Sequence, residues 1–118
     1  MASLNTFGAI LTYAIALEEN LSAYYEKIGK ADRAKDAGKR HKKLLRVRRE
    51  NVLEITLEPI DGLDESNYTF DFDDTSEAGQ QANEEHAVAF YQDVAPKINV
   101  RQAQRSLEKC GKQHAALV

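Results

Sequence analysis

The chain has 118 residues, of which 42% are hydrophobic and 30% charged, with one cysteine and no tryptophan. A chain of this length suits one domain, here residues 1–118, and buries roughly two-thirds of its unfolded surface without disulfides or a structural metal. The single Cys110 excludes an intramolecular disulfide framework and is typical of a reducing compartment. The N-terminus has no basic leader, and acidic residues end its apolar run before it reaches the length of a membrane span. We therefore expect a cytoplasmic protein without a membrane-spanning segment.

The net charge of −3 conceals a strong segregation of charge along the chain. Residues 30–49 contain ten Lys and Arg against Asp32 and Asp36, whereas residues 50–96 contain thirteen Asp and Glu and no Lys or Arg. A basic block can indicate nucleic-acid binding. No helix-turn-helix, zinc-knuckle or aromatic platform pattern accompanies this block, and apolar residues alternate with its Lys and Arg residues as in an amphipathic helix. The charges favour solvated faces or complementary surfaces of a homodimer over a nucleic-acid site.

The N-terminal part of the chain predicts a long helix. From Leu4 to Ile28, one residue every three or four positions falls on a single stripe, and this stripe is almost entirely apolar. The pattern predicts a helix over residues 4–28, which Gly29 ends. The exception within the stripe is Glu18, where a carboxylate is unexpected.

A second helix is predicted over residues 33–58. Asp32 is a suitable N-cap, and Pro59 with Gly62 provides the stop signals. The stripe of this helix is more polar than the first. It consists of His41, Leu44, Arg48, Asn51 and Ile55.

The segment 59–75 changes period and is predicted to be an irregular crossover. Aromatic and polar residues alternate over residues 67–73, which indicates an extended strand-like or edge segment rather than a helix. A single segment of this kind does not build a sheet. Its aromatic side chains are expected to cover the bundle or a dimer seam; they are Tyr68, Phe70 and Phe72.

Two further helices are predicted over residues 76–95 and 99–116. The first begins near a group of capping residues that includes Ser76, and the second begins at Asn99 in a pattern that resembles a capping box. The stripe of the last helix is Val100, Ala103, Leu107, Cys110, His114 and Leu117. Four helices with two short turns and one long connection predict an all-α fold: two helical hairpins joined by a crossover between the second and third helices.

The two predicted hairpins carry an internal repeat. Residues 16–25 and 82–91 both contain Ala-x-Glu-Glu followed by Ala-aromatic-Tyr at identical spacing. Glu18 and Glu84 occupy matched positions on the inner stripes. A buried carboxylate costs several kcal/mol unless a cation, a metal or hydrogen bonds compensate it. Either both glutamates share a compensated interior, or slightly rotated helices turn them toward water. A tyrosine follows each glutamate by seven residues on the same face: Tyr25 and Tyr91.

This pattern resembles the ferritin-like superfamily and, more closely, rubrerythrin-type proteins. The resemblance implies a four-helix bundle in which the first and third helices each provide one glutamate. It also implies that the second and fourth helices each provide Glu-x-x-His. In that family these residues together hold two iron or manganese ions, so the resemblance implies redox or peroxide-related chemistry.

The chain departs from this ligand pattern in both of the remaining helices. The last helix keeps His114, but Gly111 stands at the glutamate position. When the second helix is aligned with the last helix, Arg48 stands at the glutamate position and Asn51 at the histidine position. The remaining ligand candidates are Glu18, Glu84 and His114. A complete two-metal site of the family's pattern is therefore absent from the sequence.

Two arrangements of the interior are compatible with these residues. In the first, the guanidinium of Arg48 lies between the two glutamates and replaces the metals. In the second, the glutamates and His114 hold one iron, manganese or zinc ion, with Cys110 and Glu50 nearby.

Three functions remain open at this point. The first is a rubrerythrin- or ferritin-like protein with a reduced or lost di-iron site, and the second is a metal-free structural or partner-binding module. The third is nucleic-acid binding through residues 30–49. No catalytic residue is indicated, because no nucleophile arrangement or phosphate-binding glycine loop is present.

Overall fold

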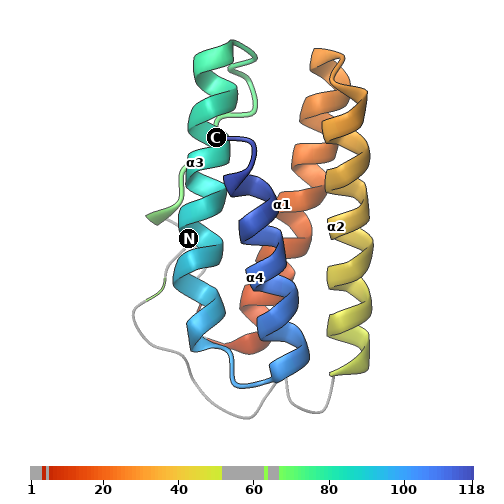
Figure 1. Cartoon of the computed structure of the whole chain (residues 1–118), viewed down its shortest axis with the longest axis vertical. Helices are drawn as coiled ribbons and strands as arrows, with labels where there is room; N and C mark the ends of the chain where they lie inside the picture. Colours follow the sequence, from red (N-terminus) through yellow and green to blue (C-terminus); the bar gives the residue numbers. More distant parts are fainter. Residues whose placement is uncertain (1–3, 5, 52–62, 64–66) are drawn as a thin grey trace.

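The computed structural model describes residues 4, 6–51, 63 and 67–118. This part of the chain forms four α-helices and a short 3₁₀ helix, so the all-α prediction is confirmed (Figure 1). The elements are α1 (Phe7–Ile28), α2 (Ala31–Glu50), α3 (Glu77–Val94), η2 (Ala95–Lys97) and α4 (Arg101–Ala115). Among the described residues, none of the helices has the length and hydrophobicity needed to cross a bilayer.

Local capping explains where the first hairpin begins and turns. The hydroxyl of Thr6 accepts a hydrogen bond of 3.0 Å from the backbone N–H of Ala9, so α1 begins three residues later than the stripe predicts. Gly29 ends α1 with a φ of 90°, in the left-handed region that favours glycine. The next helix begins at Ala31, before the predicted cap at Asp32.

The other boundaries agree with the predictions in part. Ser76 caps α3 as expected, because its hydroxyl accepts a hydrogen bond of 3.1 Å from the N–H of Gly79. The last helix begins at Arg101 rather than at Asn99, and the N-cap position is Val100. The end of α2 lies at Glu50, and the stop signals Pro59 and Gly62 predicted for it fall outside the described residues.

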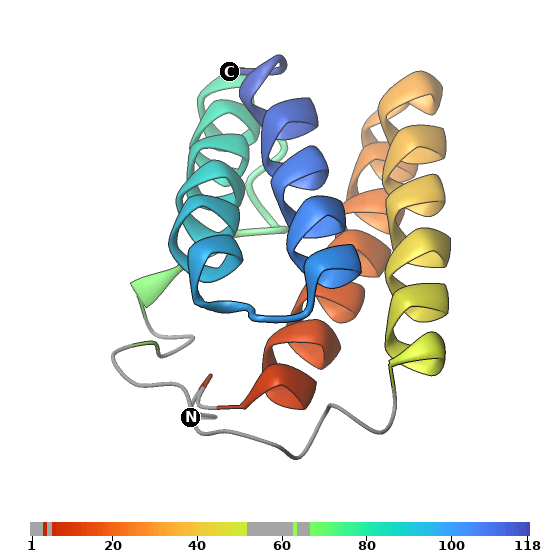
Figure 2. The same cartoon turned by 60° about the horizontal axis from the view of Figure 1, so that its bottom comes forward.

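The helices form two antiparallel hairpins, α1 with α2 and α3 with α4, which lie side by side (Figures 1 and 2). The hairpins meet partly through α2 and α4. The side chain of Asn51, at the end of α2, donates to Gln102, at the start of α4. Toward the other end, Arg40 donates to Gln113. Since α2 and α4 are antiparallel, α2 and α3 run in the same direction.

The segment that precedes α3 places aromatic side chains on the bundle, as predicted, and contains no strand between residues 67 and 76. Tyr68 is buried with its ring edge-on to Phe90, at a centroid distance of 5.4 Å. Phe72 packs against Tyr24 in the same way at 5.6 Å, and Phe70 also contacts the core. These contacts close one side of the interior.

The inner face of α2 differs from the predicted stripe. Its buried residues are Ala34, Ala37, Arg40, Leu44 and Val47. The predicted stripe placed Arg48 inside, but this side chain is exposed and Val47 is buried in its place. Helix geometry allows either residue to follow Leu44 on one face, and the gain from burying an apolar side chain selects the valine.

Candidate functional site

Glu18 of α1 and Glu84 of α3 meet in the interior of the bundle, and both have an exposed fraction of 0%. The prediction that the repeat places both carboxylates in one buried interior is therefore confirmed. Each hairpin contributes one of them at the same position of its repeat. Because an uncompensated buried carboxylate is strongly unfavourable, the donors around this pair determine what the site can do.

Two tyrosines bridge the hairpins in a reciprocal pattern. The hydroxyl of Tyr91 on α3 donates to Oε2 of Glu18, and the hydroxyl of Tyr25 on α1 donates to Oε1 of Glu84, each at 2.5 Å. Each tyrosine thus donates a hydrogen bond to the glutamate of the opposite hairpin. Burial, followed by the adjacent carboxylate, raises the pKa of both hydroxyls, which therefore stay protonated and donate.

His114 of α4 lies between the two carboxylates and contacts both. Its Nδ1 is 2.5 Å from Oε2 of Glu84, and its Nε2 is 2.8 Å from Oε2 of Glu18. Since each ring nitrogen faces a carboxylate, a doubly protonated imidazolium, which donates from both nitrogens, satisfies both contacts. Burial lowers the pKa of His114, but the hydrogen bonds and charges of the two glutamates outweigh it and raise this pKa.

Arg40 of α2 provides a second buried cation and has an exposed fraction of only 5%. Its Nε donates to Oε1 of Glu18 at 2.8 Å, and its Nη1 donates to Oε1 of Gln113 at 3.1 Å. Burial alone raises the pKa of Glu18, yet His114 and Arg40 together hold it below its usual value. We call Glu18, Glu84, Arg40 and His114 the interior cluster; its two negative and two positive charges cancel.

The prediction that Arg48 balances the glutamates is wrong, and hairpin register explains why. Glu18 lies eleven residues before Gly29 and Arg40 lies eleven residues after it, so the two are level in an antiparallel hairpin. At a rise of 1.5 Å per residue, Arg48 is about 12 Å farther along the helix axis. The family's ligand frame had placed the cation at Arg48, whereas the symmetric spacing around the turn identifies Arg40.

The remaining predicted residues lie around the cluster or away from it. Glu50 is exposed and accepts a hydrogen bond from Gln102, so it does not belong to the site. Cys110 is buried one turn before His114. Burial, together with the charge of Glu18, raises the pKa of the thiol to about 12, so it remains a neutral thiol. The reactive thiolate that metal ligation requires is therefore disfavoured.

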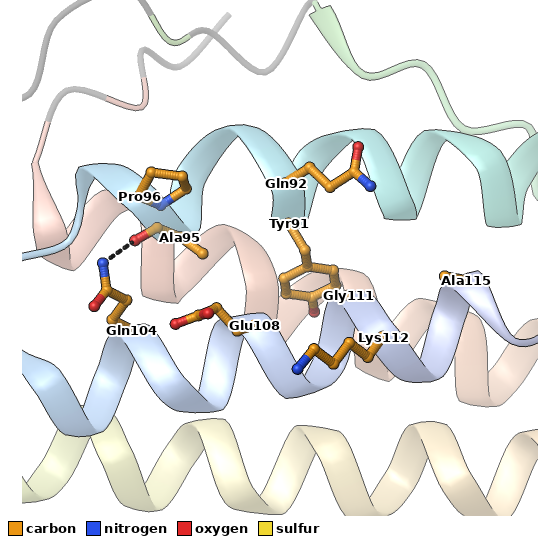
Figure 3. Close-up of a pocket in the computed structure, with 9 residues that line it drawn as sticks. All are labelled: Tyr91, Gln92, Ala95, Pro96, Gln104, Glu108, Gly111, Lys112 and Ala115. Carbon is orange, nitrogen blue, oxygen red and sulfur yellow. Dashed lines mark hydrogen bonds between the residues drawn. The ribbon is translucent and has the colours of Figure 1, made fainter.

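Gly111 brings α3 and α4 close together beside the cluster. A Cβ at this position would lie 3.0 Å from Cβ of Tyr91, which is tighter than ordinary packing allows. Gly111 and Tyr91 both line a pocket of about 510 Å³ between the two helices, and Tyr91 points toward Gly111 there (Figure 3). A glutamate at position 111, as in the family's ligand pattern, would therefore require a small shift of the tyrosine that donates to Glu18.

The donor set does not fit the metal pair that the family resemblance implies. All four carboxylate oxygens of Glu18 and Glu84 already accept hydrogen bonds from protein groups. A metal ligand must offer a lone pair, but both nitrogens of His114 act as donors toward carboxylates. Among the described residues, no group of three or more His, Cys, Asp or Glu side chains is arranged to hold a metal ion.

No protein-family model, curated protein or solved structure matches the chain. The chemistry of the site is therefore argued from its own residues. The interior cluster combines two carboxylates with an arginine that is always charged and a histidine that is charged while it contacts both glutamates. Such a cluster is electrically neutral without any external ion, and its hydrogen bonds join all four helices.

The charge states of Glu18 and His114 predict how stability depends on pH. Because the pKa of Glu18 is lowered from 4.5, its contribution is present above pH 4.5 and is lost as the pH falls further. Because the pKa of His114 is raised from 6.5, its contribution is complete below pH 6.5 and is lost as the pH rises through the folded-state value. The free energy of unfolding, measured in urea across this range, should be highest between pH 4.5 and 6.5. A maximum at alkaline pH would contradict a charged His114.

Proposed function

We propose that this chain is a ferritin-like helical bundle that works without metals, as a structural or ligand-binding module. The contact of His114 with both glutamates carries the proposal, because an imidazolium at this position supplies the positive charge that metals supply in the family. The direction of the helices supports the ferritin-like assignment. α2 and α3 run in the same direction, and the described segment before α3 passes along the bundle from Phe90, beside Tyr68, to Tyr24, beside Phe72, as the crossover of such folds does.

In this proposal the interior cluster stabilises one particular packing of the hairpins. The hydrogen bonds of Tyr25, Tyr91 and His114 cross between the hairpins, whereas Arg40 pairs with Glu18 inside the first hairpin. In some proteins buried ionic groups contribute to conformational specificity, because incorrect packings leave charges unpaired. The cluster therefore favours a single register between the two hairpins.

Because the interior cluster is closed in this way, a ligand or partner must bind at the surface of the bundle. The carboxylates are fully buried and their oxygens are occupied, so they are not available to a substrate. The surface of α2, in contrast, carries exposed cations: Lys35, Lys39, Lys42, Lys43, Arg46, Arg48 and Arg49. We propose that the protein binds an acidic ligand or partner on this side.

Metal analysis tests the proposal directly. Protein purified without chelator should contain far less than one iron, manganese or zinc ion per chain by elemental analysis. Its melting temperature should be the same with and without a chelator, because nothing that binds only the folded state is removed. A stoichiometric metal ion together with a lower melting temperature after chelation would overturn the proposal in favour of a mononuclear site.

A further inference from the structure

A groove between α2 and α4 lies directly outside the interior cluster. It has a volume of about 600 Å³, which is within the range of small-molecule sites. Lysines from both helices line it: Lys39 and Lys43 from α2, and Lys109 from α4. The lining includes one acidic residue, Asp36. The groove therefore has an excess of positive charge and suits an anion.

Arg40 connects this groove with the interior. It lines the groove, while its Nε donates inward to Glu18 and its Nη1 donates to Gln113, another lining residue. The third nitrogen, Nη2, is buried and has no hydrogen-bond partner in the described part of the chain. Buried donors without a partner are uncommon in folded proteins, so this nitrogen indicates a missing acceptor.

We propose that the groove binds the phosphate group of a small ligand. The terminal nitrogens of a guanidinium match phosphate oxygens in a forked geometry, and lysines supply further charge-assisted hydrogen bonds. The hydroxyl of Ser106, which also lines the groove, adds a neutral donor. This inference rests on the proposed function in one respect, because Arg40 must already be present as the counter-ion of Glu18.

The burial of Arg40 favours a small ligand over a nucleic acid. Arg40 is only 5% exposed and its Nη2 is buried, so a group that binds there must be small and must enter the groove between the two helices. The backbone of a nucleic acid would instead contact the exposed lysines and arginines of α2 outside the groove. Lys42 is exposed and does not line the groove, so its replacement distinguishes the two modes of binding.

The experiment is a titration of the full chain with inorganic phosphate at constant ionic strength, followed by NMR amide shifts. Saturable shifts are expected in α2 and α4. Lys109→Gln should weaken phosphate binding about tenfold, as expected for one charge-assisted hydrogen bond. The matched control Lys42→Gln should leave the affinity unchanged. Both lysines are exposed, so neither change should affect folding.

A second variant tests Arg40 itself. Arg40→Lys keeps a positive charge beside Glu18 but removes the terminal nitrogens, so phosphate binding should weaken while the fold is retained. If this variant does not fold, the comparison of Lys109→Gln with Lys42→Gln still decides the question.

Three results would overturn the proposal. They are the absence of saturable phosphate binding, an equal loss in both lysine variants, and binding of an oligonucleotide without terminal phosphates when inorganic phosphate does not bind. A metal ion in the purified protein would instead overturn the proposed function, and the titration does not depend on that measurement.

Discussion

Replacing Arg40 with alanine is expected to lower the free energy of unfolding by about 3–5 kcal/mol, as is usual when one partner of a buried ion pair is removed. The guanidinium donates to Oε1 of Glu18 at 2.8 Å, and both side chains are almost completely buried. Without it, a carboxylate with an exposed fraction of 0% loses one of its two cations. The loss is measured by urea denaturation followed by circular dichroism near pH 6.

Two further variants make this experiment specific. Arg48→Ala, on the same helix but exposed, should change the free energy of unfolding by no more than about 0.5 kcal/mol. Adding Glu18→Gln to Arg40→Ala should recover part of the lost stability, because the stranded charge is removed. Equal effects of Arg40→Ala and Arg48→Ala would show that the pair with Glu18 contributes nothing measurable.

Much of the interior could be predicted because the chain repeats itself. The shared Ala-x-Glu-Glu and Ala-aromatic-Tyr patterns of residues 16–25 and 82–91 fix which side chains face inward on α1 and α3. Local periodicity carries that information. Periodicity does not reveal that each tyrosine donates to the glutamate of the opposite hairpin, because the distance between the hairpins is set only when the bundle packs. The crossing of Tyr25 to Glu84 is therefore visible only in three dimensions.

The inner face of the second helix was harder to predict because polar residues interrupt its apolar periodicity. Basic residues occur on every face of α2, so periodicity alone does not decide which of them is buried. The frame taken from the family's ligand motif selected Arg48. The hairpin register around Gly29 selects Arg40, and the burial of Leu44 and Val47 is consistent with that choice. The groove could not be predicted, because it requires both the register of α2 on α4 and the unpaired nitrogen of Arg40.

Replacing His114 with leucine is expected to have the largest effect on stability. Among the described residues, the imidazolium is the one cation that contacts both glutamates, through Nδ1 to Glu84 and Nε2 to Glu18. Leucine has a suitable size for the space but leaves the two carboxylates facing each other without a charge between them. At neutral pH we expect a loss of at least about 3–5 kcal/mol, the range for breaking a buried pair, and a marginally stable bundle would then be largely unfolded.

The role of His114 is tested most directly by how the stability of His114→Leu depends on pH. Two facing buried carboxylates are relieved when one takes up a proton, so the variant should approach the stability of the wild type as the pH is lowered toward about 5. The matched control is His86→Leu on α3. His86 is half-buried with its ring edge-on to Phe70, and its Nδ1 has no hydrogen-bond partner within the described residues. This control should show no such recovery. If His114→Leu is equally destabilised at pH 5 and pH 8, the histidine does not act as the cation between the glutamates, and the interior cluster must be balanced in another way.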